Sequence, residues 1–409
     1  MGDIEKPPAY AEREPARSSV VLRIASAIAD VPAADWDSCA RGAEPPQLGA
    51  SYPANPLISH AFLRALEESG SAAQDTGWLP QHLLVEAPSG ALIGCMPCYL
   101  KTHSQGEYVF DHGWADAYMR AGGRYYPKLQ ASIPFTPVTG KRLLVRAGAD
   151  EREREALLLQ AAIQVTDQAG VSSLHITFLT REEWELAGNV GFLKRTDQQF
   201  HWQNETYRSF DDFLESLASR KRKAIRKERR EALSEGIEIE WVTGGDLTEA
   251  HWDAFFAFYM DTGSRKWGTP YLTRRCFSLL GETMADQILL ILAKRGSRYI
   301  AGALNVIGQD TLYGRYWGGI EDHPFLHFEV CYYQAIEFAI ARGLARVEAG
   351  AQGAHKLARG YLPCETYSAH YIADPALRRA VADYLKRERA AVAREIALLT
   401  EEAPYRSTD

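Results

Sequence analysis

A short basic block in an acidic chain is the first feature of this sequence that could do chemistry. Among 409 residues with a net charge of −7, positions 220–230 hold eight lysines and arginines against the single acid Glu228. Such a patch on an anionic protein favours a phosphate-bearing partner: a nucleotide cofactor, tRNA or an anionic membrane surface. Arg222, Arg226 and Arg229 form one stripe of a helix, and we predict that they hold the phosphates. The alternative is a solvated helix end.

A second group mixes acids, a histidine and aromatics beside one glycine, at the end of an expected strand. The run is Asp111-His112-Gly-Trp114-Ala-Asp116-Ala-Tyr118. Dense polar and aromatic mixing is typical of a ligand pocket. We predict that His112 and Asp116 take part in catalysis and that Trp114 and Tyr118 bind substrate. The alternative for a lone histidine is a structural hydrogen bond. No matching ligand set accompanies these residues, so we predict no zinc site.

A glycine- and proline-rich loop, Tyr125-Tyr126-Pro-Lys128, is the best candidate for contact with an acceptor substrate. Loops positioned by a rigid scaffold often carry binding residues. We therefore predict that Tyr125, Tyr126 and Lys128 bind substrate.

The pair in Cys95-Met-Pro-Cys98 falls within an expected strand, where positions three apart face opposite sides. No second pair completes a zinc site. The pattern favours buried or edge thiols over a redox or metal role.

The elements that must position these residues form an α+β pattern that occurs twice. In the first half we expect strands at 20–24, 81–86, 91–100, 174–178 and 199–203, with helices at 57–68 and 150–169. One basic helix begins after the cap Ser209. The second half has a strand meander over 288–317, a helix at 329–342, strands at 346–349 and 366–372, and a long helix from Pro375. Helices flanking largely antiparallel sheets define this class.

The length predicts two domains. We expect a disordered N-terminus over 1–19, a first module over 20–205, a basic linking helix over 206–236 and a second module over 237–409. The sequence has no apolar run long enough for a membrane span and no apolar signal core. A cytoplasmic location follows, with peripheral contact at the inner membrane left open.

Three runs carry a family resemblance. Positions 101–118, 123–129 and 348–361 read KTHSQGEYVFDHGWADAY, GRYYPKL and EAGAQGAHKLARGY, and they are similar to the FemAB-like family of bacterial N-acyltransferases. The element order resembles the acyltransferase fold of the GNAT superfamily. The resemblance implies tandem GNAT-like modules of the Fem type, with mixed, mostly antiparallel sheets flanked by helices.

The resemblance also implies roles for late residues. Fem-type enzymes place a lysine after a late strand, and His355-Lys-Leu-Ala-Arg-Gly360 resembles that segment. The resemblance thus implies that Lys356 stabilises the negative charge of the transition state and that Arg359 contacts the substrate. Glu348 and His355 are candidate bases, as are His327 and Glu329, since acyl transfer to an amine needs a proton acceptor.

The GNAT pattern would place a pyrophosphate on backbone amides after the central strand, near Gly318 and Gly319. Glu321 and Asp322 follow them, and the usual glycine-rich loop is absent. The basic helix is therefore a rival phosphate site.

Three hypotheses remain. The first is an N-acyltransferase that moves an acyl group, long chains included, from acyl-CoA or acyl carrier protein to an amine such as an amino-lipid or sphingoid base. The second is a Fem-type transferase that uses aminoacyl-tRNA and a cell-wall precursor. The third is a non-catalytic binding module. We expect direct transfer, no tightly bound cofactor and no DNA partner, because the sequence has no nucleophile elbow, Walker loop or dinucleotide fingerprint.

Overall fold

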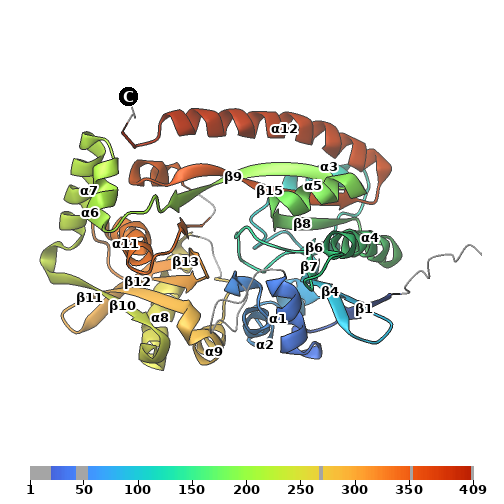
Figure 1. Cartoon of the computed structure of the whole chain (residues 1–409), viewed down its shortest axis with the longest axis horizontal. Helices are drawn as coiled ribbons and strands as arrows, with labels where there is room; N and C mark the ends of the chain where they lie inside the picture. Colours follow the sequence, from blue (N-terminus) through green and yellow to red (C-terminus); the bar gives the residue numbers. More distant parts are fainter. Residues whose placement is uncertain (1–19, 43–53, 267–269, 351–352, 407–409) are drawn as a thin grey trace, which may run out of the picture.

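The computed structural model describes residues 20–42, 54–266, 270–350 and 353–406, so the predicted disordered N-terminus lies outside the described residues. Within that part, helices pack on two β-sheets (Figure 1). The predicted α+β class is confirmed. The chain is built as two halves that share the larger sheet.

The larger sheet has eleven described strands in the order β10-β11-β12-β13-β14-β9-β15-β8-β6-β5-β2. Their bounds are β2 (Trp78–Pro80), β5 (Cys98–Lys101), β6 (Lys128–Ala131), β8 (Ser173–Leu179), β9 (Leu193–Gln203), β10 (Ile237–Thr243), β11 (Ile288–Arg295), β12 (Arg298–Ile307), β13 (Thr311–Gly319), β14 (Arg346–Glu348) and β15 (Leu362–Ile372). The smaller described sheet, β1-β3-β4-β7, contains β1 (Val21–Ala25), β3 (His82–Glu86), β4 (Leu92–Met96) and β7 (Leu144–Val145).

The two halves exchange strands at the centre of the larger sheet. β9, from the first half, lies between β14 and β15 of the second half, and β15 pairs in turn with β8. Each half also has one parallel pair, β6 with β8 and β13 with β14. The other strand pairings in the described part of the chain are antiparallel, and the sequence pattern predicts largely antiparallel sheets.

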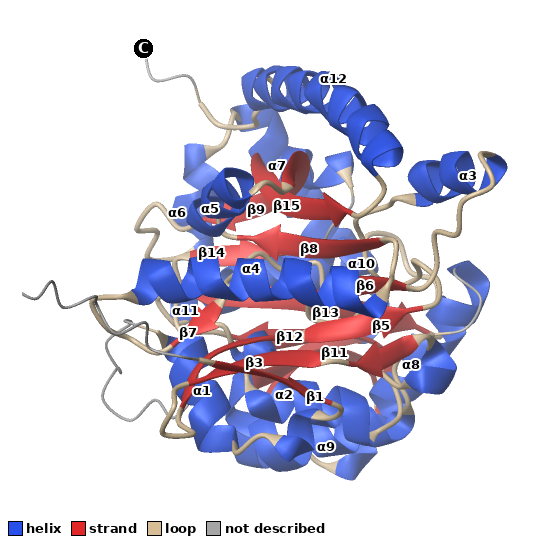
Figure 2. Ribbon diagram, turned by 90° about the vertical axis from the view of Figure 1, so that its right-hand side faces the viewer, coloured by secondary structure: helices blue, strands red, loops and turns tan. Residues whose placement is uncertain are grey.

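Helices cover the sheets on both faces (Figure 2). The first half contributes α1 (Ala33–Arg41), α2 (His60–Glu68), α3 (His112–Arg120), α4 (Glu151–Ala169) and α5 (Arg181–Val190). The second contributes α6 (Phe210–Ser216), α7 (Ser219–Ala232), α8 (Glu249–Lys266), α9 (Arg274–Met284), α10 (Leu326–Phe328), the π-helix η7 (Glu329–Tyr333), α11 (Gln334–Ala341), the 3-10 helix η8 (Ala354–Arg359) and α12 (Pro375–Glu401).

Packing ties the halves together. One buried apolar cluster joins α1 and α2 to α8, α9 and the β11-β12 hairpin. Across that contact, Thr273 at the start of α9 donates its hydroxyl to the carbonyl of Ser69, 3.1 Å away. The long helix α12 spans β9 and β15, the two exchanged strands (Figure 1). The halves are therefore held by a shared sheet and a shared core.

Several elements differ from the sequence prediction. The single basic helix is two, because Leu217 is extended between α6 and α7. The stretch after Asp111, expected at a strand end, forms α3. Lys128, expected in a loop, begins β6, and η8 replaces part of the loop expected before Gly360. The helix expected at 329–342 opens with a π-helical turn, a local irregularity that is frequent at functional sites.

Candidate active site

A cavity of about 460 Å³ lies between the two halves, beside the point where β13 and β14 diverge; we call it the central cleft. Its size is in the range of about 300–1,000 Å³ that is typical of small-molecule sites. Aromatic side chains from both halves form most of its wall, and a few polar groups complete it. The aromatic members are Tyr108, Phe110, Tyr259, Tyr271, Tyr316, Trp317 and Tyr332, and the polar members include Asn305, Arg315 and His327.

A bulge in β13 shapes this cleft. Gly314 and Tyr316 pair with successive residues of β12, which leaves Arg315 as the extra residue. Bulges re-aim side chains, and Arg315 reaches across the cleft to donate to the carbonyl of Phe135 in the first half. The parallel pairing with β14 ends just before the bulge, at Tyr313 and Glu348, and the residues that follow each of them, Gly314 and Ala349, line the cleft. The cleft therefore opens where Glu348 stands.

Glu348 is a buried carboxylate without a hydrogen bond. The residue is 4% exposed, and its Oε2 has no hydrogen-bond partner among the described residues. Nε2 of His201, from β9, lies 3.9 Å from this oxygen. Burial raises the pKa of Glu348 to about 7, and it lowers the pKa of His201 to about 3. Glu348 can thus exchange a proton near neutral pH, while His201 stays neutral there.

Lys356, on η8, is also buried, and its side chain makes one hydrogen bond within the described residues. Its Nζ donates to the carbonyl of Gly350 at 2.7 Å, and the residue is 1% exposed. Burial lowers the pKa of Lys356 to about 8. The charges of Glu348 and Lys356 both influence the pKa of the Cys364 thiol, so the two residues lie in the same region of the molecule. The end of β14 and the helix η8 therefore each carry one group that titrates near neutrality.

His355 lies at the edge of the cleft wall. Its Nε2 is 2.9 Å from the hydroxyl of Tyr332, a cleft residue of η7. Partial burial and the charge of Arg359 lower the pKa of His355. Arg359 itself donates to Oε2 of Glu228 at 2.9 Å, which ties η8 to α7. His355 is thus close to the cleft, whereas Arg359 is engaged in a structural ion pair.

The two predicted phosphate-loop glycines are committed to packing. A side chain at Gly318 would meet the backbone of Phe258 at 2.2 Å. The amide of Gly319 donates to the hydroxyl of Thr262 at 3.2 Å. Glu321, which follows, is paired with Arg295 at 2.8 Å. These contacts do not support a pyrophosphate site here, because Phe258 fills the space at Gly318 and the amide of Gly319 is already bonded. Arg265, which donates to the carbonyl of Gly319 at 2.9 Å, is paired with Asp261.

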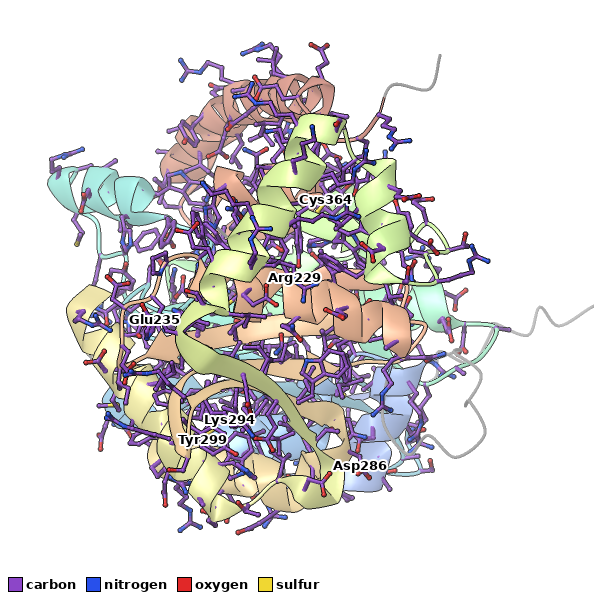
Figure 3. All side chains as sticks on the ribbon, turned by 90° about the vertical axis from the view of Figure 1, so that its left-hand side faces the viewer. Arg229, Glu235, Asp286, Lys294, Tyr299 and Cys364 are labelled. Carbon is purple, nitrogen blue, oxygen red and sulfur yellow. The ribbon has the colours of Figure 1, made fainter. Side chains whose placement is uncertain are left out.

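The three predicted arginines of the basic helix differ in their surroundings. Arg229 binds Glu329 and Glu337 at 2.8 and 2.7 Å, beneath α7 in Figure 3. Arg226 binds Asp211 at the surface, 3.0 Å away. Arg222 has no side-chain partner within the described part. Five further cations of α7 share this state: Arg220, Lys221, Lys223, Lys227 and Arg230.

The predicted residues of the first half gather around a buried ion cluster rather than in the central cleft. Nζ of Lys128 donates to Oε2 of Glu107 at 2.7 Å and to Asp111, and the hydroxyl of Tyr125 donates to Asp111 at 2.7 Å. Tyr126 binds the hydroxyl of Ser104 at 2.8 Å. Lys128 and Tyr125 are fully buried, so they hold structure and do not face a free acceptor.

The remaining residues of that prediction lie on α3. His112 lines the central cleft and stacks on Phe110, with ring centres 5.8 Å apart. Trp114 packs on His370, 5.0 Å between ring centres. Asp116 is exposed, and Tyr118 covers Gly123, where a side chain would meet its ring at 2.4 Å. Of these four residues, only His112 is placed beside the cleft.

Comparison with known proteins decides the family. A family model described as peptidoglycan biosynthesis/recognition, FemAB-like, matches residues 27–407. The chain belongs to the FemAB-like family. It is thus a transferase of the Fem type, and no curated protein gives a match.

Two solved structures are similar to this FemAB-like protein. The crystal structure of FemX is 13% identical, covers 86% of this chain and 98% of its own, and has a TM-score of 0.52. L-PGS from Bacillus licheniformis is 10% identical over 78% of this chain and 95% of its own, with a TM-score of 0.48. The FemX likeness shows a shared fold, and the predicted α+β class, with mostly antiparallel sheets flanked by helices, is confirmed.

In this FemAB-like protein His112 lines the central cleft, and His355 bonds the cleft residue Tyr332. Glu348 precedes the lining residue Ala349 in the chain, and Lys356 bonds the carbonyl of Gly350, the next residue after Ala349. The predicted glycine loop, the arginines of α7 and the Lys128 cluster lie elsewhere and do not line the central cleft. Sequence reasoning missed His201 and Arg315. Alternation along β9 could have placed His201 on one face with Gln199, but the bulge at Arg315 has no local signal.

Two absences concern only the described part of the chain. No group of three or more histidines, cysteines or acids there could hold a metal ion. No helix there has both the length and the apolar character that crossing a membrane requires.

Cys95 and Cys98 are buried on β4 and β5, as expected for structural thiols.

Proposed function

We propose that this protein joins an acyl group to a primary amine in the central cleft, taking the acyl group directly from a thioester such as acyl-CoA or acyl carrier protein. The observation that carries the proposal is the pair Glu348 and Lys356. Both are buried beside the cleft, and their pKa values, about 7 and about 8, suit a base and an acid at neutral pH.

The chemistry needs two proton movements. Glu348, deprotonated, takes one proton from the acceptor ammonium, and the freed nitrogen attacks the thioester carbonyl. The C–N bond forms while negative charge grows on the carbonyl oxygen, where the ammonium of Lys356 stabilises it. The C–S bond then breaks, and the thiolate takes the second proton from nitrogen. Amide and thiol are the products, and no covalent enzyme intermediate is required.

The wall of the cleft favours an apolar acyl group. Seven aromatic side chains line it, whereas the charged members are few. Burying an apolar chain against such a wall is favourable by about 25 cal/mol per Å². A long-chain donor with an amino-lipid or sphingoid acceptor fits this wall better than an acetyl donor does.

The donor's phosphates need a cationic site outside the glycine loop. Helix α7 packs against η7 and η8, which carry the cleft residue Tyr332 and Lys356. Six of its cations have no partner in the described residues, so they are available for phosphate. We assign the phosphates of the donor to this face, Arg222 included.

A second candidate is aminoacyl transfer from tRNA to a cell-wall precursor. The unpaired cations of α7 favour it, since phosphate neutralisation dominates nucleic-acid affinity. The family's description, peptidoglycan biosynthesis/recognition, favours it as well.

One assay separates these donors. The full chain is incubated with sphinganine and palmitoyl-CoA, acetyl-CoA or alanyl-tRNA, and amide products are measured by mass spectrometry. We expect a palmitoyl amide, formed roughly 100- to 1,000-fold more slowly by Lys356→Met and at the wild-type rate by Lys386→Met, an exposed control on α12. Transfer from alanyl-tRNA alone would replace the first candidate by the second. Donor binding without any product would support the binding module and overturn both.

A further inference from the structure

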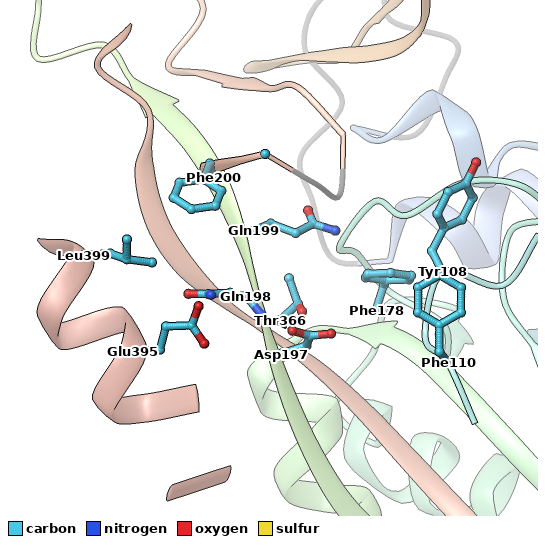
Figure 4. A pocket seen from close by; sticks show the side chains of 11 residues that line it. Tyr108, Phe110, Phe178, Asp197, Gln198, Gln199, Phe200, Thr366, Glu395 and Leu399 are labelled. Atoms are coloured by element: carbon cyan, nitrogen blue, oxygen red, sulfur yellow. Dashed lines mark hydrogen bonds between the residues drawn. The ribbon is translucent and has the colours of Figure 1, made fainter. Parts of the chain in front are cut away.

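The wall of the central cleft carries one permanent charge, that of Arg315. Among the described residues that line the cleft there is no aspartate, glutamate or lysine. The acids Asp197 and Glu395 line a second pocket, of about 300 Å³, between β9 and α12 (Figure 4), and they are not part of the cleft wall. The cleft is therefore positively charged, with no acid in the described part of its own wall.

Neutral groups hold the guanidinium of Arg315 in place. Its Nη2 donates to the carbonyl of Phe135, which also accepts from the hydroxyl of Tyr316 at 3.3 Å. Its Cζ lies 5.2 Å from the centre of the Tyr316 ring. Within the described residues Arg315 has no ion pair, Nη1 makes no hydrogen bond, and the buried Nε has no hydrogen-bond partner. The side chain is thus fixed in the cleft wall while its charge and part of its donors stay unused.

An arginine in this state favours an anionic ligand. The guanidinium presents its donors as a planar fork that matches two oxygens of a carboxylate or a phosphate. The attraction between opposite charges is stronger beside a wall of aromatic rings than in bulk water. A buried donor without a partner destabilises a fold, so the contacts of Arg315 within the chain do not explain its place. A bound anion would supply the missing counter-charge.

Arg315 stands close to the proposed base. A side chain at Gly314, the neighbour of Arg315, would meet the carbonyl of Glu348 at 3.3 Å. The charges of the two residues also influence each other: burial raises the pKa of Glu348, and the positive charges of Arg346 and Arg315 oppose that rise. Arg315 and Glu348 form no ion pair with each other. An anion at Arg315 and an amine at Glu348 would therefore lie within a few bonds of each other in one ligand.

We propose that Arg315 binds an anionic group of the acceptor, a carboxylate or a phosphate, that lies within a few bonds of the reacting amine. The acceptor is then a zwitterion: its anion pairs with Arg315, its amine faces Glu348, and its apolar tail packs on the aromatic wall of the cleft. Arg315 is the residue that selects this class of acceptor. The inference rests on the proposed function for the role of Glu348, but binding of the anion does not require turnover.

Calorimetry on the full chain tests the site with 2-aminooctanoic acid and with its neutral match, 2-amino-1-octanol. We expect the amino acid to bind roughly tenfold more tightly, or better, since hydrogen bonds between ionised groups are the strong ones. Arg315→Met should remove this preference, and Arg315→Lys should keep only part of it, because lysine has the charge without the fork. The matched variant Arg298→Met, which removes an exposed arginine of β12 outside the cleft wall, should leave the preference unchanged.

The phosphate ester of the amino alcohol distinguishes the two anions, because the group recognised by Arg315 binds more tightly than the other. Equal affinity for the amino acid and the amino alcohol, no binding of either, or a preference that survives Arg315→Met would each overturn the proposal. Thermal unfolding shows that each variant is folded, and the comparison of ligands on the wild-type protein needs no variant.

Transfer from palmitoyl-CoA to the same two ligands separates this inference from the proposed function. If the amino acid binds through Arg315 but neither ligand is acylated, the proposed function fails and the anion site stands. If the amino alcohol is acylated with the same kcat/KM as the amino acid, the anion site fails and the proposed function stands. We expect both ligands to be acylated, with the lower KM for the amino acid.

Discussion

Two buried groupings of lysine and carboxylate lie beside the two parallel strand pairs, one in each half of the molecule. In the first half, Lys128 at the start of β6 bonds both Glu107 and Asp111. In the second half, Glu348 at the end of β14 has no hydrogen bond among the described residues, and Lys356 has only a backbone carbonyl. The buried lysine is therefore paired with carboxylates in the first half and bonds only a carbonyl in the second, although Glu107, Asp111 and Glu348 each keep one buried oxygen without a hydrogen bond among the described residues.

The difference separates structure from chemistry. Burial opposes the charge of Lys128, but its two carboxylates outweigh burial and raise its pKa. Lys356 has no such partner, so burial lowers its pKa to about 8. A permanently charged, fully bonded lysine can hold loops together. A lysine that titrates near neutrality beside a base of similar pKa can serve a reaction.

The largest expected effect is a loss of stability when the buried lysine of the first half, Lys128, is removed. Lys128→Met leaves Glu107 and Asp111 buried without their hydrogen-bonded counter-charge, with only Lys101 nearby at 4.0 Å from Glu107. Removing one partner of a buried pair costs about 3–5 kcal/mol. We expect the free energy of unfolding, measured by urea denaturation with circular dichroism, to fall by that amount. The matched variant is Lys356→Met, which removes a buried lysine that bonds no carboxylate. It should cost less than half as much; equal losses would show that both groupings are structural.

The next expected effect is a dependence of the transfer rate on pH, set by Glu348 and Lys356 in the second half. Glu348 must be ionised to accept a proton, and its folded pKa is about 7, so the rate should rise about tenfold per pH unit below that value. Lys356 must keep its proton, so the rate should fall above its pKa of about 8. The profile of kcat against pH should be bell-shaped, with its maximum between these values. In Lys356→Met the alkaline limb should vanish; a flat profile in the wild-type protein would count against both assignments.

The smallest expected effect concerns the donor. The variant Lys227→Glu, Arg230→Glu reverses two unpaired charges of α7, which should raise KM for palmitoyl-CoA several-fold and leave kcat unchanged, because phosphate attraction acts on binding. Raising the salt concentration should also raise the KM of the wild-type protein for palmitoyl-CoA, because salt screens the same attraction. The control Arg379→Glu, Lys386→Glu, on α12, carries the same charge change. A matching rise in that control would mean that net charge, and not α7, sets the effect.

The sequence predicts the elements well where the signal is local. Hydrophobic periodicity and caps place the long helix from Pro375, and α12 spans Pro375–Glu401. The strand meander appears as β11, β12 and β13. The extended conformation of Leu217, which splits the basic helix, has no such signal, since a charged helix pattern continues through it.

The site is harder to predict because distant segments complete it. Glu348 and Lys356 come from family resemblance and from their place after a strand. The partners of Lys128 lie 17 and 21 residues away, so nothing local distinguishes a bonded lysine from a free one. His201 reaches Glu348 only because β9 is exchanged into the second half, and strand exchange depends on tertiary pairing.

The most direct test of the central claim compares two buried glutamates, one from each grouping, whose pKa values burial raises to about 7. The kcat for palmitoyl transfer is measured at pH 7.5 for Glu348→Gln and Glu107→Gln, with the folded fraction of each checked by circular dichroism. Loss of a general base costs roughly 10²–10⁴-fold, so Glu348→Gln should lose at least 100-fold while Glu107→Gln stays within a few-fold. The opposite ranking, or equal losses, would contradict the assignment of the reaction to the end of β14.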